Sequence, residues 1–312
     1  MRQPQTTQQL LQQFARLPRP EQSVKLRFTG IGTRDAYNIA APFPMMETTV
    51  LPARVEERHS ENSHVMFFEE TEDGVWSPIA DAPRLQLQDP FVTPYKDEWI
   101  IGGVRTIADP DHPDRIVSWV TEFYKGPSLY DLKLIATGPE HMKDIRLLLL
   151  PDDRIAVCTR PQGEIGGRGK IGFMVIDSLA ELTPDKINAA AVFHDQFIPE
   201  EWGGANELHL LSNGYIGVLG HIACFELGGA RRYYSMTFAI DPKDGSHYGM
   251  KIVATRSQFA PGPAKRPDLT DVLFSGGIKR IKDGEALLYT GVSDAEAHVI
   301  RIKDPFLEYE QL

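Results

Sequence analysis

The sequence is short of the features that mark disulfide-bonded, zinc-binding and membrane-spanning proteins. Only two cysteines, Cys158 and Cys224, occur among 312 residues, and both lie in apolar runs, so we expect buried thiols in a reducing compartment. No CxxC or HExxH pattern is present, so no metal is expected. No apolar run reaches the ~20 residues that a membrane-spanning helix needs.

Positive charge is also scarce. Lysine and arginine number 33 against 43 aspartate and glutamate residues, which gives a formal net charge of −10, and no basic run occurs. These counts argue against a nucleic-acid or anionic-membrane partner, although a local basic pocket could still bind one anion. The amino terminus lacks a basic-then-apolar signal layout and the final LEYEQL is no known address, so we expect a cytoplasmic protein.

The sequence does contain enough apolar residues, 42%, for a sizeable core. Near its start, residues 3–17 carry apolar side chains at helical spacing, preceded by a capping-box pattern of Thr6 and Gln9. The apolar positions are Leu10, Leu11, Phe14 and Leu17. We therefore expect residues 1–24 to form a short helix and lead-in, with the helix packed against the outside of the domain.

From residue 25 onwards, short apolar runs alternate with turn residues, and hairpin follows hairpin without intervening helices. A unit of about 55 residues recurs, as expected of a β-propeller blade. Its second strand reads WIIGGV, IAVCTR, YIGVLGH and ALLYTGV in four copies, and a more divergent first copy ends in HVMFFEE. We predict an all-β protein in which residues 25–312 form a single five-bladed β-propeller. A two-sheet sandwich is the alternative.

Polar residues recur at the same points of these units. One set stands at strand starts: Arg34, Asp35, Asn38, Asp89, Lys143, Asp144, Asn206, Glu207 and Ser275-Gly276-Gly277. A second set follows the long strands: Arg58, Arg105, Arg160, His221 and Asp294. Each residue taken alone could simply cap a turn in solvent. Because the inner strands of a propeller line its channel and their end loops converge, we expect the sets to surround one pocket.

Four segments in the same order resemble glycoside hydrolase family 130, the five-bladed inverting β-mannoside phosphorylases. They are QDPFVT at 88–93, KDIRLLLLPDDRIAVCTRPQG at 143–163, GHIACFE at 220–226 and FSGGIKRIKDGEALLYTGVSDAEAHVIRI at 274–302. With RDAYNIAAPF and RVEERHSENS, the whole chain is still more similar to the β-1,2-mannosyltransferase/phosphorylases of glycosyltransferase family 108, formerly a domain of unknown function. The chain departs from the family 130 pattern at Gln88, Phe91 and Thr159, where that family has Glu, Arg and His.

The resemblance implies an enzyme that acts on β-mannosides. It would carry out inverting phosphorolysis of β-1,2-linked mannose oligosaccharides to mannose-1-phosphate, mannosyl transfer from a sugar nucleotide, or both. Phosphorolysis needs a general acid and a cluster of cations to hold phosphate. Candidates for that cluster are Arg105, Lys143, Arg160 and His221. No cofactor is expected; inorganic phosphate or a sugar nucleotide is the co-substrate. Because the sequence has no Walker or Rossmann motif, a nucleotide would be bound by these side chains.

Asp89 is the candidate general acid, and in the resembling family this carboxylate works through a sugar hydroxyl. We expect Pro90 to hold Asp89 in an extended conformation and to remove one hydrogen-bond donor from the sheet. Crowding by Phe91 and Trp99 would raise the pKa of Asp89, as an acid working near neutral pH needs. Glu207 is the reserve acid or base.

The remaining polar residues are candidates for contacts with sugar hydroxyls, which carboxylates and amides bind in pairs. They are Asn38, Arg58, Asp144, Asn206 and Asp294. Trp202 and Tyr289 are candidate stacking walls, although each is more often a core residue. Two other functions stay open: a glycosidase on the same fold, and a propeller that binds sugar or protein without catalysis. Converging buried Asp and Arg residues would favour an enzyme, since a scaffold does not need them.

Overall fold

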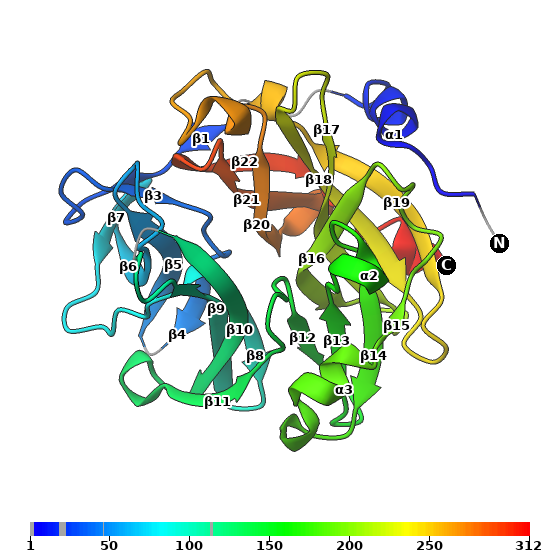
Figure 1. Ribbon diagram of the computed structural model, residues 1–312, viewed down its shortest axis with the longest axis horizontal. Coiled ribbons are helices and arrows are strands. Elements are labelled where there is room, and N and C mark those ends of the chain that lie inside the picture. Colours follow the sequence, from blue (N-terminus) through cyan, green and yellow to red (C-terminus); the bar gives the residue numbers. More distant parts are fainter. Residues whose placement is uncertain (1–2, 19–22, 46, 113–114) are drawn as a thin grey trace.

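The computed structural model describes residues 3–18, 23–45, 47–112 and 115–312. Within them, five sheets stand around a common axis and form the blades of a β-propeller (Figure 1). The predicted all-β, five-bladed fold is confirmed, and the two-sheet sandwich is wrong. The four repeated motifs lie in β9, β13, β17 and β21, and each of these is the second strand of its blade.

Blade 1 comprises β3 (Asp35–Tyr37), β5 (Thr48–Glu56), β6 (His64–Glu72), β7 (Val75–Pro78) and β2 (Arg27–Phe28), with β4 (Phe43–Met45) paired to β5. Blade 2 comprises β8 (Gln88–Tyr95), β9 (Glu98–Ala108), β10 (Ile116–Gly126) and β11 (Lys133–Thr137). Blade 3 comprises β12 (Arg146–Leu149), β13 (Ile155–Thr159), β14 (Gly172–Ile176) and β15 (Ala191–Val192). In blades 2 to 5 the first-named strand lies nearest the axis (Figure 1).

Blade 4 comprises β16 (Trp202–Leu210), β17 (Ile216–Phe225), β18 (Arg231–Ile240) and β19 (His247–Ala254). Blade 5 comprises β20 (Leu273–Arg280), β21 (Glu285–Val292), β22 (Glu296–Lys303) and β1 (Val24–Lys25). The described helices are α1 (Thr7–Phe14), α2 (Gly163–Gly166) and α3 (Pro184–Asn188), with short 3₁₀ turns at Leu129–Asp131, Leu179–Glu181, Arg256–Gln258, Pro267–Leu269, Lys282–Gly284 and Tyr309–Gln311.

The two ends of the chain close the ring. β1 is the outer strand of blade 5, where Val24 pairs with Val299 of β22. Only one residue further on, β2 joins the outer edge of blade 1, where Arg27 pairs with Val75. The first residues of the propeller therefore tie its last blade to its first.

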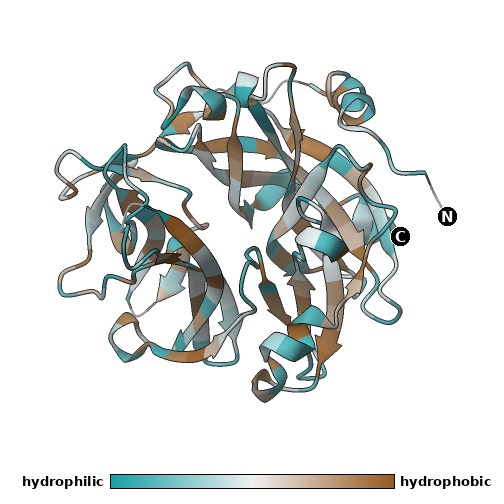
Figure 2. Ribbon diagram, in the orientation of Figure 1, coloured by the Kyte–Doolittle hydropathy of each residue, from teal (hydrophilic) through white to brown (hydrophobic). Residues whose placement is uncertain are grey.

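A separate apolar core lies between each pair of neighbouring blades. Blades 1 and 2 share a cluster around Phe67 and Ile101, and blades 2 and 3 share one around Phe123 and Val157. Similar clusters join blade 3 to 4, blade 4 to 5, and blade 5 back to blade 1. Apolar segments run along the strands and hydrophilic ones along the loops (Figure 2). The cores hold the blades in a fixed ring, which positions the loops at its ends.

Helix α1 forms where the sequence predicts it and packs beside β19 on the outside of the ring (Figure 1). The capping box is present: Gln9 N donates to Thr6 Oγ1 at 3.2 Å, and Thr6 N donates to Gln9 Oε1 at 2.9 Å. Leu10 reaches the core between blades 3 and 4. The backbone NH of Thr7 also donates to Glu201 at 2.7 Å, so a carboxylate of blade 4 anchors the amino-terminal end of the helix.

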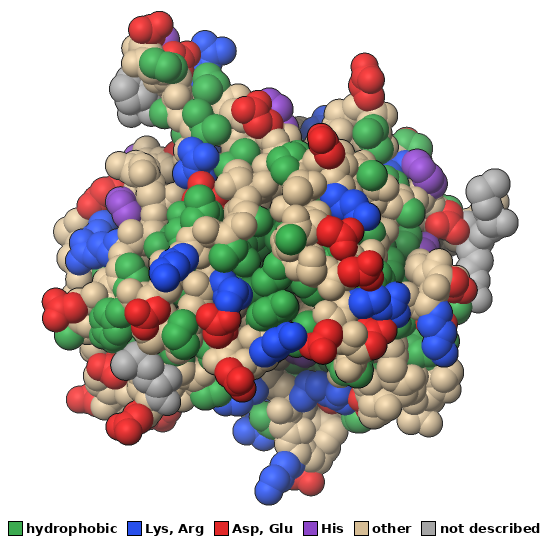
Figure 3. Space-filling model, turned by 90° about the horizontal axis from the view of Figure 1, so that it is seen from below, with side chains coloured by type: hydrophobic (Ala, Val, Ile, Leu, Met, Phe, Trp, Pro, Cys, Tyr) green, Lys and Arg blue, Asp and Glu red, His purple; other side chains and the backbone are tan. Residues whose placement is uncertain are grey.

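On the face shown in Figure 3, Lys and Arg side chains alternate with Asp and Glu side chains, and neither sign gathers into a patch. None of the described helices is both long and apolar enough to cross a membrane.

Candidate active site

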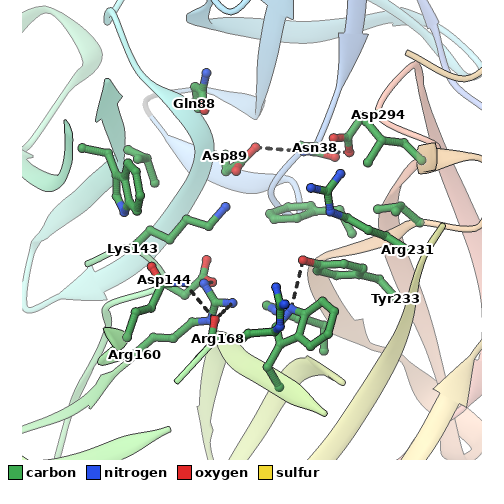
Figure 4. Close-up of a pocket in the computed structure, with 18 of the residues that line it drawn as sticks. Asn38, Gln88, Asp89, Lys143, Asp144, Arg160, Arg168, Arg231, Tyr233 and Asp294 are labelled. Carbon is green, nitrogen blue, oxygen red and sulfur yellow. Dashed lines mark hydrogen bonds and ion pairs between the residues drawn. The ribbon is translucent and has the colours of Figure 1, made fainter. Parts of the chain in front are cut away.

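A cavity of about 850 Å³ is lined by residues from all five blades. It contains most of the residues that the sequence singles out: Asn38, Asp89, Lys143, Asp144, Arg160, His221 and Asp294. Figure 4 shows Asp89, Asn38 and Asp294 on one side of this cavity, with Lys143, Asp144 and Arg160 facing them. The in-register polar residues of different blades therefore meet in one place.

Four of these residues share an uncommon backbone. Asn38, Asp89, Asp144 and Asp294 all have positive φ, at +44°, +51°, +59° and +50°. Side chains rarely adopt this region, and Asn and Asp tolerate it best because their short polar groups bond locally. At each of these positions the side chain lines the cavity. Backbone strain of this kind concentrates at functional sites.

One expectation about the backbone, at Asp89, is wrong. We expected Pro90 to keep Asp89 extended, but its φ of +51° lies in the left-handed region. The pairing register of β8 with β9 shifts between Gln88 and Phe91, so a β-bulge occupies this point. Since Pro90 has no NH to donate, the bulge costs no hydrogen bond there. Similar bulges occur in β16 and β20, at Asn206 and Gly276.

The carboxylates on the blade 1 and blade 5 side are linked through Asn38. Its Nδ2 donates to Asp89 Oδ1 at 2.8 Å and to Asp294 Oδ1 at 3.4 Å. Arg54 Nη1 approaches Asp89 Oδ1 at 3.2 Å from behind the cavity wall. Asp89 is buried, with 7% of its surface exposed.

The two carboxyl groups have opposite pKa shifts. Burial favours the neutral form of Asp89, but Arg54, Lys143 and the Asn38 hydrogen bond outweigh it and lower its pKa. Burial raises the pKa of Asp294, and the neighbouring Asp89 adds to this rise. In the cavity without substrate, Asp89 is thus the more acidic member of the pair.

This outcome corrects the expectation that apolar crowding would raise the pKa of Asp89. Phe91 packs against Phe123 in the core between blades 2 and 3. Trp99 packs against Phe43 between blades 1 and 2. Both rings therefore belong to inter-blade cores, and the cations and the amide around Asp89 decide its pKa.

The opposite side of the cavity is cationic. Arg160 is buried, with its Nε donating to Gly203 O at 2.8 Å and its Nη2 to Arg168 O at 3.2 Å. Its Nη1 lies 3.4 Å from Asp144 Oδ2 and has no hydrogen-bond partner among the described residues. Lys143 is half-buried and points toward Asp89 across the cavity (Figure 4). Burial favours the neutral form of Asp144, but Arg160, Lys143 and Arg146 outweigh it and hold the pKa of Asp144 below its usual range.

His221 completes the cationic side as a neutral ring. Burial lowers its pKa to about 3. The neighbouring cations Arg160, Lys143 and Arg146 also lower the pKa, whereas Asp144 acts in the opposite direction. Its Nδ1 bonds Asn206 Oδ1 at 2.9 Å, while the buried Nε2 has no partner among the described residues. The Asn206 amide can present either its oxygen or its NH₂ group to Nδ1, so the His221 proton can be on either ring nitrogen. Nε2 can therefore accept a hydrogen bond from P–OH or donate one to P–O⁻.

Gly204 allows this arrangement. A Cβ at this position would lie 2.8 Å from Arg160 Cδ and 2.9 Å from both Asp144 Oδ2 and His221 Cε1. No side chain larger than hydrogen fits without moving one of these three groups, all of which are buried. The floor of the cationic side therefore requires glycine.

Further out, the wall is aromatic and carries arginine. The Arg168 guanidinium lies 4.5 Å from the ring centroid of Phe225 and 5.5 Å from that of Trp202. Trp202 Nε1 donates to Tyr233 Oη at 3.1 Å, and the Tyr233 ring stacks on His221 with centroids 5.2 Å apart. This outer wall is thus continuous with the cationic side, and it includes Trp202, one of the two predicted stacking walls.

Two predicted arginines lie elsewhere. Arg105 does not line the cavity and is ion-paired with Glu122. Its neighbours Val104 and Thr106 do line it, and since side chains alternate along a strand, Arg105 faces the other side of blade 2. Arg58 is likewise outside the lining and is ion-paired with Asp35. The expectation that both arginines point into the pocket is corrected by these positions.

Asn206, Glu207 and Tyr289 are also outside the lining. Asn206 lies behind His221, whose ring it orients. Glu207 Oε2 accepts from the backbone NH of Ile278 at 2.7 Å and contacts His209 at 2.7 Å, so it bridges blades 4 and 5. Tyr289 is 8% exposed and packs in the core between blades 5 and 1, which corrects its prediction as a stacking wall.

Sequence reasoning missed several residues that shape the site. Arg54 and Arg146 are buried directly behind the cavity, where they contact Asp89 and Asp144. Arg168, Arg231 and Arg266 line its outer part and come from loops and the β17–β18 hairpin. The one available signal was the presence of Arg54 and Arg146 within otherwise apolar strands, which requires a buried partner. Across the part of the chain that the structure describes, no cluster of His, Cys, Asp and Glu could hold a metal.

Comparisons with known proteins agree with this fold. The family model described as "Protein of unknown function (DUF1861)" matches residues 12–308. A mannose phosphorylase from Leishmania mexicana, MPT-4, solved with a phosphate ion, is 34% identical over 97% of this chain and 94% of its own, with a TM-score of 0.89. MPT-1, a GDP-Man-dependent mannosyltransferase from the same organism, is 33% identical over 96% and 95%, with a TM-score of 0.87.

A more distant structure supports the fold alone. The β-1,2-mannobiose phosphorylase from Listeria innocua is 11% identical over 94% of both chains, with a TM-score of 0.61. A comparison with curated proteins gives no significant match. The chain belongs to the DUF1861 family, and it shares a family with the mannose phosphorylase and the mannosyltransferase of L. mexicana.

Proposed function

We propose that the chain is an inverting β-mannoside phosphorylase that transfers a mannosyl group to inorganic phosphate. One observation carries the proposal. Arg160 Nη1 and His221 Nε2 are buried, lack hydrogen-bond partners among the described residues although Arg160 Nη1 is ion-paired with Asp144, and belong to residues that line a cavity whose other side presents Asp89 and Asp294. Buried polar atoms without partners are uncommon, so this place fits an anion. The phosphate ion solved with the L. mexicana phosphorylase supports the same co-substrate.

The reaction then needs few groups. A phosphate oxygen held by Lys143, Arg160 and His221 attacks C1 of the mannosyl unit and forms the new C–O–P bond. The C1–O bond to the rest of the oligosaccharide breaks, and its electron pair stays on the leaving oxygen. That oxygen takes a proton whose source is the carboxyl group of Asp89, relayed through a sugar hydroxyl. Inversion leaves α-mannose-1-phosphate and a shortened oligosaccharide.

Asp89 has to be protonated for this step, although its pKa is low in the cavity without substrate. Bound phosphate brings negative charge next to Lys143, which cancels part of the field that keeps Asp89 ionised. A sugar over the carboxyl group removes more water and favours the neutral form. Binding of both substrates therefore moves the pKa of Asp89 upward, toward the value that a general acid needs.

The positions of the carboxylates argue against hydrolysis. An inverting glycosidase needs a carboxylate base across the anomeric carbon from its acid, with room for water. The side that faces Asp89 carries Lys143 and Arg160, and its carboxylate, Asp144, is ion-paired with Arg160 and Arg146. Glu207, the reserve base, does not line the cavity. Asp294 and Asn38 remain for the hydroxyl groups of the sugar.

A second candidate function is mannosyl transfer from a sugar nucleotide. The cationic side continues into the outer wall of Arg168, Trp202 and Tyr233, where a nucleoside attached to the phosphate would lie. The GDP-Man-dependent relative supports this alternative.

Incubation with β-1,2-mannobiose and phosphate tests the first proposal. ³¹P NMR should show α-mannose-1-phosphate, together with one equivalent of free mannose. Parallel reactions with water alone, and with a set of mannose nucleotides plus mannobiose as acceptor, separate the alternatives. Release of mannose that is independent of phosphate would instead indicate a glycosidase. No turnover with any of these donors would leave a binding propeller.

A further inference from the structure

Arg54 lies near the end of β5 and contacts three carboxylates at once. Its Nη1 is 3.2 Å from Asp89 Oδ1, and its Nη2 is 3.0 Å from Glu56 Oε2 and 3.1 Å from Glu61 Oε2. The guanidinium also lies over the ring of Tyr37, 5.0 Å from the centroid. Only 4% of its surface is exposed, and it does not line the cavity.

This geometry leaves the guanidinium no freedom to adjust. The guanidinium is planar, and it meets acceptors along two edges and an aromatic ring on one face. Only one orientation satisfies all of these contacts. The contact with Asp89 is therefore imposed by blade 1, and the Asp89 carboxylate has to orient toward Arg54. Together with Asn38, the guanidinium fixes Oδ1 and leaves Oδ2 for the cavity.

The segment that connects blade 4 to blade 5 holds the arrangement in place. Residues 255–272 run between β19 and β20, and Lys265 reaches from this segment into blade 1. Its ammonium contacts Glu56 and lies 2.9 Å from Glu61 Oε1, while its backbone NH donates to Ser293 O at 3.0 Å. Glu56 and Glu61 are thus shared between Arg54 and Lys265, so blade 1 and this segment fix the same pair of carboxylates.

We infer that Arg54 is a positioning residue for Asp89, which orients the carboxylate and sets the pH above which it can no longer supply its proton. This inference rests on the proposed phosphorolysis. Arg54 touches neither cavity nor substrate, and it acts through Asp89.

The charges that face Asp89 explain why Arg54 should dominate once substrates bind. Lys143 and Asp144 face it from blade 3, Asp294 from blade 5, and Arg54 from blade 1. The buried Arg146 of blade 3 also acts on Asp89, but Arg54 has the largest effect among the cations. Phosphate neutralises Lys143, and Asp144 is already paired with Arg160. Arg54 is shielded from any ligand by the cavity wall, so its field on Asp89 persists in the complex. It therefore limits how far the pKa of Asp89 can rise.

Two substitutions separate charge from orientation. Arg54→Met removes the cation and keeps a long side chain, so the alkaline limb of the pH profile of kcat should move upward by about one pH unit or more. Arg54→Lys keeps the charge, so the limb should stay near its wild-type position. The rate should nevertheless fall, because an ammonium cannot meet all three carboxylates in one plane. Loss of packing alone would lower the rate without moving the limb.

A second measurement does not depend on turnover. In protein labelled with ¹³C at aspartate carboxyl carbons, the Asp89 signal is identified as the one missing from Asp89→Asn. Its titration midpoint should rise in Arg54→Met compared with the wild type. If the wild type shows no phosphorolysis, the proposed function fails and this titration still decides the effect of Arg54 on Asp89. A midpoint unchanged in folded Arg54→Met overturns the inference.

Arg280 provides the matched control. It is held by two carboxylates, with Nε 2.7 Å from Asp304 Oδ2 and Nη1 2.8 Å from Glu310 Oε1, and neither of these carboxylates lines the cavity. Arg280→Met should lower the melting temperature and leave both the pH profile and the Asp89 titration unchanged. If Arg54→Met does not fold, Arg54→Lys and Arg54→Gln take its place in the titration: Gln should raise the midpoint and Lys should not. A shifted limb in Arg280→Met, or equal midpoints in Lys and Gln, contradicts the inference.

Discussion

On the blade 1 and blade 5 side of the cavity, each carboxylate has its partners within the protein. Asp89 bonds Asn38 and Arg54, and Arg54 is itself held by Glu56 and Glu61. On the blade 3 and blade 4 side, Arg160 and His221 each keep a buried nitrogen without a hydrogen-bond partner among the described residues. The first side is complete, in that its carboxylates meet cations and amides of the protein, whereas on the second, incomplete side Lys143, Arg146 and Arg160 outnumber the one carboxylate, Asp144. In the proposed phosphorolysis, the acid is therefore held in place beforehand and phosphate would complete the cationic side.

The largest effect is expected on the complete side. Asp89→Asn keeps the shape of the side chain and removes the proton, so kcat for phosphorolysis should fall by about 10²–10⁴-fold. Binding of mannobiose, measured by calorimetry, should change little, because the amide still forms hydrogen bonds. A variant that turns over at the wild-type rate would remove the mechanism proposed for Asp89.

Substitutions on the incomplete side should weaken the binding of phosphate. Arg160→Ala removes a charged donor from the anion, so the KM for phosphate should rise by about 10- to 150-fold, the range for hydrogen bonds to charged groups. Binding of the mannoside should be spared. Arg160→Lys should recover part of the affinity. Equal loss of phosphate and mannoside binding would show that the two sides are not independent.

Acid should destabilise the cationic side through His221. Its pKa is about 3 in the folded chain and 6.5 when unperturbed, so between these values the unfolded state binds more protons. Stability from this neutral ring is present above pH 6.5 and is lost as the pH falls. Between pH 7 and pH 5 the loss should be about 2 kcal/mol. Denaturant unfolding at both pH values should show a smaller loss in His221→Gln, and an identical loss would exclude His221 as the cause.

The smallest effect is expected outside both sides. Arg105→Gln removes a cation that faces away from the cavity and pairs with Glu122. The KM for phosphate should stay within about two-fold of the wild type, as for surface substitutions away from a site. A rise as large as that of Arg160→Ala would place Arg105 in the anion site after all.

The sequence predicts the fold and the meeting of polar residues because both follow from a repeat. Strand order is copied in each unit, so Asn38, Asp89 and Asp144 fall at equivalent turns and converge by geometry alone. Arg105 is different: whether a strand residue faces the cavity depends on alternation and register, and a shift of one residue reverses the side. Arg58 was misplaced in a similar way, since it follows a strand and pairs with Asp35.

The pKa of Asp89 could not be predicted for another reason. It depends on Arg54 and Lys143, which come from two other blades and are far from Asp89 in sequence. Phe91 and Trp99 are close in sequence but face the inter-blade cores. The local sequence shows which groups are present at a turn, whereas the electrostatic field at that turn depends on residues from other blades. The same holds for Arg168 and Arg266, whose loops have no repeating pattern.

The pairing of β1 with β22 has a consequence for synthesis on the ribosome. Val24 is synthesised long before its partner Val299. Until Val299 is made, the first strand has no neighbour on blade 5, and the cavity lacks Asp294 and the full ring that surrounds it. Pairings between such distant residues form slowly because the intervening chain has to be ordered first. A nascent chain truncated before β22 should therefore hold no working site.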